Sequence, residues 1–116
     1  MIIYYNPQCS KCRDAVEVLK ENNCEFTIRE YLKQPPTKKE LRELLAKIGC
    51  QPIDIIRQKE ELFQKKFLNK KFEDEEWIQI LIEHPELIER PIIIDGYKAV
   101  IGRPPEKIIE LIKRKK

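Results

Sequence analysis

Two cysteines three residues apart, Cys9 and Cys12, lie in the segment NPQCSKCR, which joins a short apolar run to a helical pattern. A thiol at the start of a helix meets unpaired backbone amides and the positive end of the helix dipole, and both favour the thiolate. Arg13 adds a positive charge close by. Because the thiolate is the nucleophilic form, Cys9 is predicted to be the reactive residue of this chain.

Cys12 lies one helical turn beyond Cys9 on the same face, a separation that a disulfide can bridge without movement of the backbone. Cys12 is therefore placed to resolve an intermediate that forms on Cys9. A CxxC pair after a strand and before a helix is typical of redox sites. We expect no metal site, since an all-cysteine zinc site normally needs a second CxxC, and Cys24 and Cys50 are isolated.

The remaining candidates have simpler interpretations. Cys24 and Cys50 are interpreted as small packing or surface residues, because a free buried cysteine behaves as a small hydrophobe. His84 is the only histidine and precedes Pro85 at the end of a predicted helix, where interaction with the last carbonyls explains it better than a role as a base. Trp77 is interpreted as a core residue.

Three arginines stand at the ends of predicted elements. Arg57 follows the apolar run IDII, Arg90 precedes Pro91 and a strand, and Arg103 follows another strand. A single arginine is usually a solvated cation. Three that converge could surround an oxyanion, because guanidinium groups match tetrahedral oxyanions with paired hydrogen bonds.

The predicted elements begin with strand, helix and strand. Residues 1–5 form an apolar run, residues 10–22 carry apolar side chains on one helical face, and residues 24–29 alternate. The alternation predicts that Cys24 and Ile28 face inward. A helical crossover normally places the two strands parallel in one sheet.

A helical block is predicted next. Thr37 and Glu40 form a capping box for a helix that Gly49 ends. Residues 52–70 are interpreted as short helical pieces, and Asp74 is expected to cap a further helix that stops at His84 and Pro85.

The last part predicts a hairpin and a helix. Residues 92–94 and 98–101 are expected to be strands around an Asp95-Gly96 turn. Pro104 and Pro105 open a final helix, whose inward face is predicted to consist of Ile108, Ile109 and Ile112. This order predicts an α/β fold with a thioredoxin-like β-α-β…β-β-α core in one domain, 1–116, with a helical insertion at about 35–88.

The composition excludes several functional classes. The chain has 23 basic and 20 acidic residues in 116, and the two signs are interleaved, which does not indicate a nucleic-acid partner. The basic block KRKK at 113–116 is interpreted as a solvated terminus. No apolar run has membrane-spanning length, and the first residues do not form a signal peptide. We therefore expect a cytoplasmic, monomeric protein whose cysteines stay reduced.

Five segments together resemble the arsenate reductase family of thioredoxin-like proteins, of the glutathione- and glutaredoxin-linked type: YYNPQCSKCR, EYLKQPPTKKEL, IIRQKEEL, EHPELIERPIIID and IGRPPEKI. The resemblance implies a nucleophile at Cys9 and an oxyanion site formed by Arg57, Arg90 and Arg103. It also implies a cis peptide at Arg90-Pro91 beside the thiol.

The same resemblance implies how the reaction proceeds. Arsenate would form a thiolate adduct on Cys9, a second thiol would attack, and arsenite would leave behind a disulfide. No bound cofactor is implied, and glutathione with glutaredoxin, or thioredoxin, would supply the electrons. Among the oxyanion-binding candidates we also count Arg13, while Asn6 and Pro91 are expected to shape the site.

Two positions depart from well-known members of that family. Tyr5 stands where they have a histidine, so a neighbour that lowers the pKa of the thiol is missing. Cys12 stands where serine is common, so the disulfide can close within the protein.

Two other functions remain open. The related Spx-type regulators share the fold and the CxxC pair but bind RNA polymerase; they lack an arginine at the place of Arg103 and extend further beyond the last helix. A general thiol-disulfide or glutathione-transfer protein would use the same arginines to hold a carboxylate.

Overall fold

A four-stranded sheet with strand order β2-β1-β3-β4 forms the centre of the fold in the computed structural model, which describes residues 1–113. β1 (Ile2–Tyr4) pairs parallel with β2 (Thr27–Arg29) and antiparallel with β3 (Ile92–Asp95), and β3 pairs antiparallel with β4 (Lys98–Ile101). The helix α1 (Ser10–Glu21) joins β1 to β2. The predicted parallel pair with a helical crossover is confirmed. The basic block at 113–116 lies outside the described residues except for Lys113.

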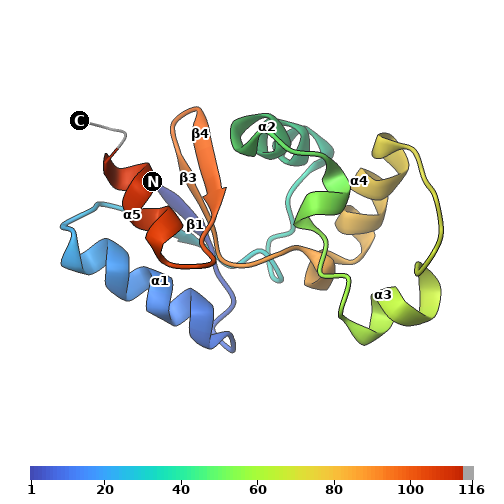
Figure 1. Ribbon diagram of the computed structural model, residues 1–116, viewed down its shortest axis with the longest axis horizontal. Helices are drawn as coiled ribbons and strands as arrows, with labels where there is room; N and C mark the ends of the chain where they lie inside the picture. The colour runs from blue at the N-terminus through green and yellow to red at the C-terminus, as the bar shows by residue number, and fades with distance from the viewer. Residues whose placement is uncertain (114–116) are drawn as a thin grey trace.

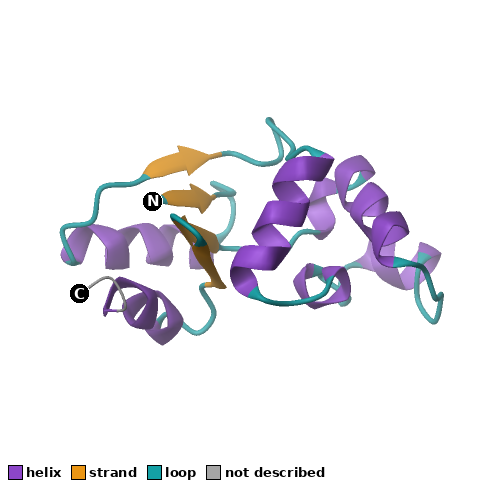
Figure 2. Cartoon of the chain, turned by 90° about the horizontal axis from the view of Figure 1, so that it is seen from above, coloured by secondary structure: helices purple, strands orange, loops and turns teal. Residues whose placement is uncertain are grey.

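Alternate residues of the strands face two different layers. Ile3 and Ile93 pack with α1 and α5 (Glu106–Lys113) on one face of the sheet. Tyr4 and Ile92 pack on the other face against the helical block. Figure 1 shows α1 and α5 together below and beside the strands, while the helical block lies to the other side. Figure 2, from above, shows the same separation.

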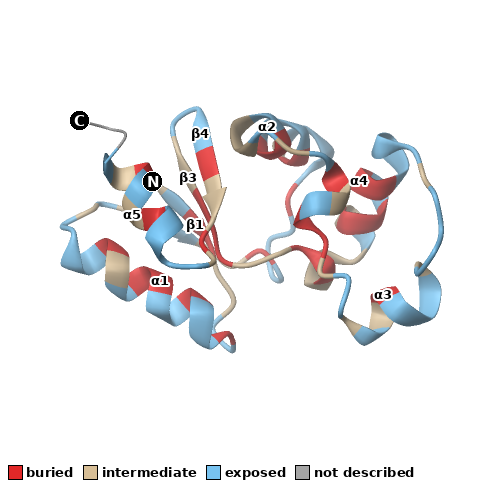
Figure 3. Cartoon of the chain, in the orientation of Figure 1, coloured by how far each residue is buried: buried red, intermediate tan, exposed pale blue. Residues whose placement is uncertain are grey.

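The helical block lies between β2 and β3 in the chain, as predicted, although the single-domain boundaries stay a prediction. It consists of α2 (Lys38–Ile48), η1 (Pro52–Ile55), α3 (Glu61–Lys66), α4 (Asp74–Glu83) and η2 (Pro85–Leu87). Its buried residues form one cluster with Tyr4, Ile92 and Ala99 of the sheet. Figure 3 shows buried segments along α2 and α4.

α2 begins with the predicted capping box. The Glu40 backbone N–H donates to Thr37 Oγ1 over 3.1 Å, and the Thr37 N–H donates to Glu40 Oε1 over 3.0 Å. Gly49 ends the helix in the left-handed region, with φ of 82°, which glycine adopts without steric cost. Arg29 at the end of β2 pairs with Glu40, so the start of α2 is fixed to the sheet edge.

β2 is shorter than predicted, and Ile28, which was predicted to face inward, is exposed. The strand covers only three residues, and Ile28 is 46% exposed. Cys24 and Phe26 precede the strand and are half-buried against the cluster that includes α1 and α5. Because β2 is an edge strand, its register is set by a single neighbour, and alternation alone does not tell which face is covered.

Two predicted boundaries are wrong by one residue. Glu73, not Asp74, caps α4, and its backbone N–H donates to Glu76 Oε1 over 3.0 Å. Asp95 pairs with Lys98 inside the hairpin, so the two turn residues are Gly96 and Tyr97 rather than Asp95 and Gly96. Gly96 has the positive φ, 62°, that such a turn needs.

The covered face of the last helix overlaps the predicted one but is centred on Ile108 and Leu111. Ile108 and Leu111 are buried, while Ile109 and Ile112 are half-buried at the margin. Residues three apart share a helix face, and the sheet and α1 cover the face that contains Leu111.

Candidate active site

Cys9 is the N-cap residue of α1, as predicted. The preceding loop is closed by two hydrogen bonds to Asn6: the Cys9 N–H donates to its carbonyl over 2.9 Å, and the Gln8 N–H donates to its Oδ1 over 3.0 Å. Cys9 is buried at the first turn of this helix. The sulfur therefore sits at the positive end of the helix, where a thiolate is favoured.

The two thiols of the CxxC pair ionise differently. Burial alone would raise the pKa of Cys9, but hydrogen bonds from Cys12, the charge of Arg90 and the Lys11 backbone N–H together lower that pKa below its usual value. Burial and the neighbouring Cys9 raise the pKa of Cys12 to about 11, although a backbone hydrogen bond at Asn6 opposes this. Both thiols are free, and the pair lies near but not at disulfide distance.

Arg13 is exposed and lies outside the arginine cavity. Its Nη1 donates to the Pro7 carbonyl over 2.8 Å and so braces the loop before Cys9. The guanidinium group that lowers the pKa of Cys9 is that of Arg90, which comes from another part of the chain.

The hairpin brings Arg90 and Arg103 together. Arg90 stands two residues before β3 and Arg103 two residues after β4, so antiparallel pairing places both at the same end of the hairpin. The Gly102 N–H donates to the Pro91 carbonyl over 2.8 Å and continues this pairing beyond the strands. The Arg90-Pro91 peptide is cis, as expected, and Arg103-Pro104 is cis as well.

Arg57 reaches the same place from the helical block. Its backbone N–H donates to the Leu87 carbonyl over 2.7 Å, next to a β-bridge between Ile56 and Ile88. The segment after η1 is thus tied to the segment that leads into β3. This pairing explains how an arginine 33 residues away in sequence comes beside Arg90.

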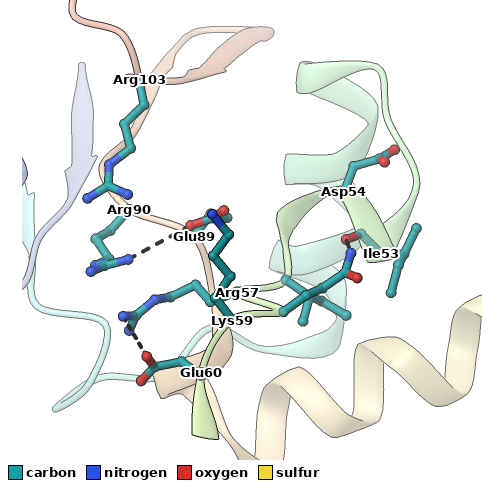
Figure 4. A pocket seen from close by; sticks show the side chains of 10 residues that line it. Ile53, Asp54, Arg57, Lys59, Glu60, Glu89, Arg90 and Arg103 are labelled. Atoms are coloured by element: carbon teal, nitrogen blue, oxygen red, sulfur yellow. Dashed lines mark hydrogen bonds and ion pairs between the residues drawn. The ribbon is translucent and has the colours of Figure 1, made fainter. Parts of the chain in front are cut away.

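The three arginines line one open cavity of about 570 Å³. Figure 4 shows their side chains in a column from Arg103 through Arg90 to Arg57. Arg57 Nη2 pairs with Glu60 at 3.0 Å, and Arg90 Nη1 lies 3.8 Å from Glu89. The Nε atoms of Arg90 and Arg103 are buried and have no hydrogen-bond partner among the described residues. Unpartnered buried donors of this kind suit an anionic ligand.

Several residues of this site were not predicted. Glu60, Glu89 and Lys59 line the cavity, and the charges of the two thiols, Arg90 and Arg57 act on the buried Tyr31. Glu60 and Lys59 belong to the segment IIRQKEEL, and Tyr31 to EYLKQPPTKKEL, but charged loop residues and an aromatic residue after a strand give no sequence signal of their own.

The other predicted candidates lie elsewhere. Cys24 and Cys50 are half-buried against different hydrophobic clusters. His84 ends α4, but its side chain lies beside Glu86, at 3.4 Å, and against the Phe67 ring, so the predicted side-chain contact with the last carbonyls is not seen. Trp77 is buried in the helical block, as predicted.

Among residues 1–113, two other kinds of feature are not found, a metal site and a membrane-spanning helix. No three His, Cys, Asp or Glu side chains among residues 1–113 gather as metal ligands would. Within the same range, no helix combines the length and the apolar character needed to cross a membrane.

Comparison with known proteins decides the family. The model of the ArsC family matches residues 4–111. The chain belongs to the ArsC family. It is 40% identical to the "Uncharacterized protein YfgD" of Escherichia coli K12, over 95% of this chain and 94% of that protein. It is 38% identical to an "Arsenate reductase" of Haemophilus influenzae, over 97% of this chain and 98% of that protein.

The solved structures agree with this assignment. An "Arsenate reductase from Vibrio cholerae" superposes with a TM-score of 0.88 at 35% identity and covers 94% of each chain. The predicted arsenate reductase family and thioredoxin-like fold are therefore confirmed. Membership supports thiol-dependent oxidoreductase chemistry for this ArsC protein.

Proposed function

We propose that this ArsC protein reduces arsenate to arsenite, with Cys9 as the nucleophile and Arg57, Arg90 and Arg103 as the oxyanion site. The observation that supports this best is the pair of buried, unpartnered Nε donors of Arg90 and Arg103 in a cavity whose Arg90 also lowers the pKa of Cys9. A thiolate that attacks an anion faces repulsion between like charges. Guanidinium groups on the anion's oxygens reduce this repulsion as the adduct forms.

The reaction then has three steps. Cys9 Sγ bonds to the arsenic atom, and one arsenate oxygen leaves as water after taking up protons. A second thiol attacks Cys9 Sγ, so an S–S bond forms, the S–As bond breaks, and its electron pair reduces arsenic(V) to arsenic(III). A dithiol reductant, glutaredoxin or thioredoxin, finally reduces the disulfide.

Cys12 is one candidate for the second thiol, since it lies next to Cys9 and is hydrogen-bonded to it. Glutathione is the other. The cavity is much larger than one tetrahedral oxyanion, which favours a second molecule beside the substrate. The same volume also supports the alternative of general thiol-disulfide or glutathione-transfer chemistry. A cytoplasmic location suits either route, because a reducing compartment keeps the thiols free.

The testing experiment is arsenate-dependent oxidation of NADPH, coupled separately to glutathione with glutaredoxin and to thioredoxin. We expect turnover in at least one system, and none after Cys9→Ser. Cys12→Ser separates the two routes: it abolishes turnover if Cys12 is the second thiol and spares it if glutathione is. Turnover of a mixed disulfide without any turnover of arsenate would support the general thiol-exchange function instead.

A further inference from the structure

Tyr31 carries a buried hydroxyl that no residue of the described chain satisfies. The side chain is 0% exposed, and its oxygen has no hydrogen-bond partner among residues 1–113. A buried hydroxyl without a partner is costly, and most buried polar atoms in proteins have one. The free hydroxyl therefore indicates a partner that is present only in another state of the site.

Charged groups from three elements face this hydroxyl. The pKa of Tyr31 is raised to about 12, mainly by burial. Negative charges on Cys12 and Cys9 also raise this pKa, whereas Arg90 and Arg57 lower it. Among the charges of its neighbours, that of Cys12 acts on it most strongly. Tyr31 consequently remains a neutral donor at physiological pH, within the influence of both thiols.

The local structure holds the phenol ring in one place. Tyr31 follows β2 in a turn in which the Lys33 and Gln34 N–H groups donate to the Glu30 carbonyl, over 3.0 and 2.9 Å. Its ring stacks on Tyr4, with centroids 6.1 Å apart and an interplanar angle of 19°. A donor fixed in this way can serve a new acceptor with little reorganisation.

We propose that the Tyr31 hydroxyl donates a hydrogen bond to Cys12 Sγ when that sulfur carries negative charge, and so positions the second thiol. The proposal rests on the proposed pairing of Cys9 with Cys12. In the resting site the Cys12 thiol interacts with Cys9, and the Tyr31 hydroxyl makes no hydrogen bond to it. Once Cys9 is in an adduct and Cys12 ionises, the buried sulfur needs another donor.

Burial favours Cys12 over the oxyanion as the acceptor. Cys12 is 0% exposed, like Tyr31, whereas an oxyanion enters the site from solution. The hydroxyl oxygen itself is closed to solvent. An acceptor already inside the protein can reach it more easily than one from solution.

The test uses an aromatic disulfide in place of arsenate. With 5,5′-dithiobis(2-nitrobenzoate), the Cys9 thiolate first forms a mixed disulfide and releases one nitrothiobenzoate anion. The Cys12 thiolate then attacks Cys9 Sγ, the Cys9–Cys12 bond forms, and the second nitrothiobenzoate leaves with the electron pair. The parent protein and every variant carry Cys24→Ser and Cys50→Ser, so that only Cys9 and Cys12 can release nitrothiobenzoate.

The decisive comparison is Tyr31→Phe against Tyr4→Phe. Both remove one buried phenol hydroxyl from the same stacked pair, but the charges that act on Tyr4 are those of Arg29 and Glu40. We expect Tyr31→Phe to slow the second release about tenfold, the factor for one hydrogen bond to a charged group. The pH–rate profile of the second release should also move to higher pH, while the rate of the first release stays within about twofold of that of the parent protein. Tyr4→Phe should leave both phases unchanged.

The outcomes separate the proposals. The role of Tyr31 is overturned if the second release is as fast in Tyr31→Phe as in the parent protein. It is also overturned if the substitution changes only the first release, or only the protection of Cys9 by phosphate. Release of only one anion by the parent overturns the Cys9–Cys12 pairing and the role of Tyr31 with it. Arsenate turnover, measured independently, still decides the proposed reduction. If Tyr31→Phe fails to fold, the second release is measured with 3-fluorotyrosine in a Tyr4→Phe protein. The more acidic phenol should speed this release, and an unchanged rate overturns the proposal.

Discussion

If Arg57 binds the oxyanion as proposed, Glu60 competes with the oxyanion for it, and removal of the Glu60 charge should strengthen binding. The Glu60 carboxylate lies 3.0 Å from Arg57 Nη2 and lines the same cavity. An oxyanion that binds Arg57 has to displace this carboxylate or share the guanidinium group with it. Glu60→Gln weakens the competing pair and removes one negative charge from the cavity wall.

The exposure of the pair limits the size of the effect. The side chains are 19% exposed for Arg57 and 38% for Glu60, so solvent screens most of their attraction. Pairs of this kind contribute about 0.5–1 kcal/mol, which corresponds to roughly two- to fivefold tighter binding of phosphate or arsenate.

Protection of Cys9 from alkylation measures this change directly. Phosphate is titrated at low, constant ionic strength, and the rate of iodoacetamide labelling at Cys9 gives the dissociation constant. Glu61→Gln is the matched control: it makes the same charge change one residue away, where the carboxylate pairs instead with Lys65 at 2.6 Å. Equal effects of the two variants would show a general charge effect, and weaker binding in Glu60→Gln would refute the competition for Arg57.

Three further predictions concern the thiol, the arginines and the start of α2. Cys9 should be alkylated first of the four thiols, with a pH profile below that of free cysteine because hydrogen bonds and Arg90 lower its pKa; peptide mapping identifies the labelled residue. Alanine at any one of the three arginines should cost about 2–4 kcal/mol in the catalytic step, and lysine should recover only part, as measured by kcat/KM. Glu40→Gln should lower the free energy of unfolding at pH 7 by about 1–2 kcal/mol, a value reduced for its 37% exposure. Hydrogen bonds from Arg29 and Thr37 lower the pKa of Glu40 to about 2, so in urea titrations this difference should persist above pH 4.5 and vanish as the pH falls toward 2.

Local sequence signals predicted most of the fold. The strand-to-helix junction at Cys9, the Thr37 capping box and the helix stop at Gly49 are each determined by neighbouring residues, and the structure contains all three. Apart from the one-residue shifts at the α4 cap and the hairpin turn, errors arose where the deciding contact is distant. The covered face of α5 depends on α1 and the sheet, and the exposure of Ile28 depends on which strand occupies the sheet edge.

The site shows the same division. The placement of Cys9 follows from its own turn of helix. The charge that acts on it, however, comes from Arg90, before the neighbouring strand β3, and not from Arg13. The convergence of Arg57 on Arg90 depends on backbone hydrogen bonds between two loops, and no periodic pattern of apolar residues predicts these. Tyr31 could not be predicted as part of the site because its significance lies in an unsatisfied hydroxyl, which is visible only when its surroundings are known.

The hairpin that carries Arg90 and Arg103 also gives the protein a natural attachment point for reporters. Its turn, Gly96 and Tyr97, lies at the end opposite both arginines, separated from them by strands about 13 Å long, and Tyr97 is 82% exposed. Residues added in this turn lengthen the loop but leave the pairing of Ile92 with Ile101 unchanged, and with it the spacing of the two arginines. A fluorophore or affinity tag placed there would follow the enzyme in a cell or on a surface without altering its chemistry. The same residues inserted beside Gly102 would, in contrast, interrupt the pairing next to the site and increase the distance between Arg90 and Arg103.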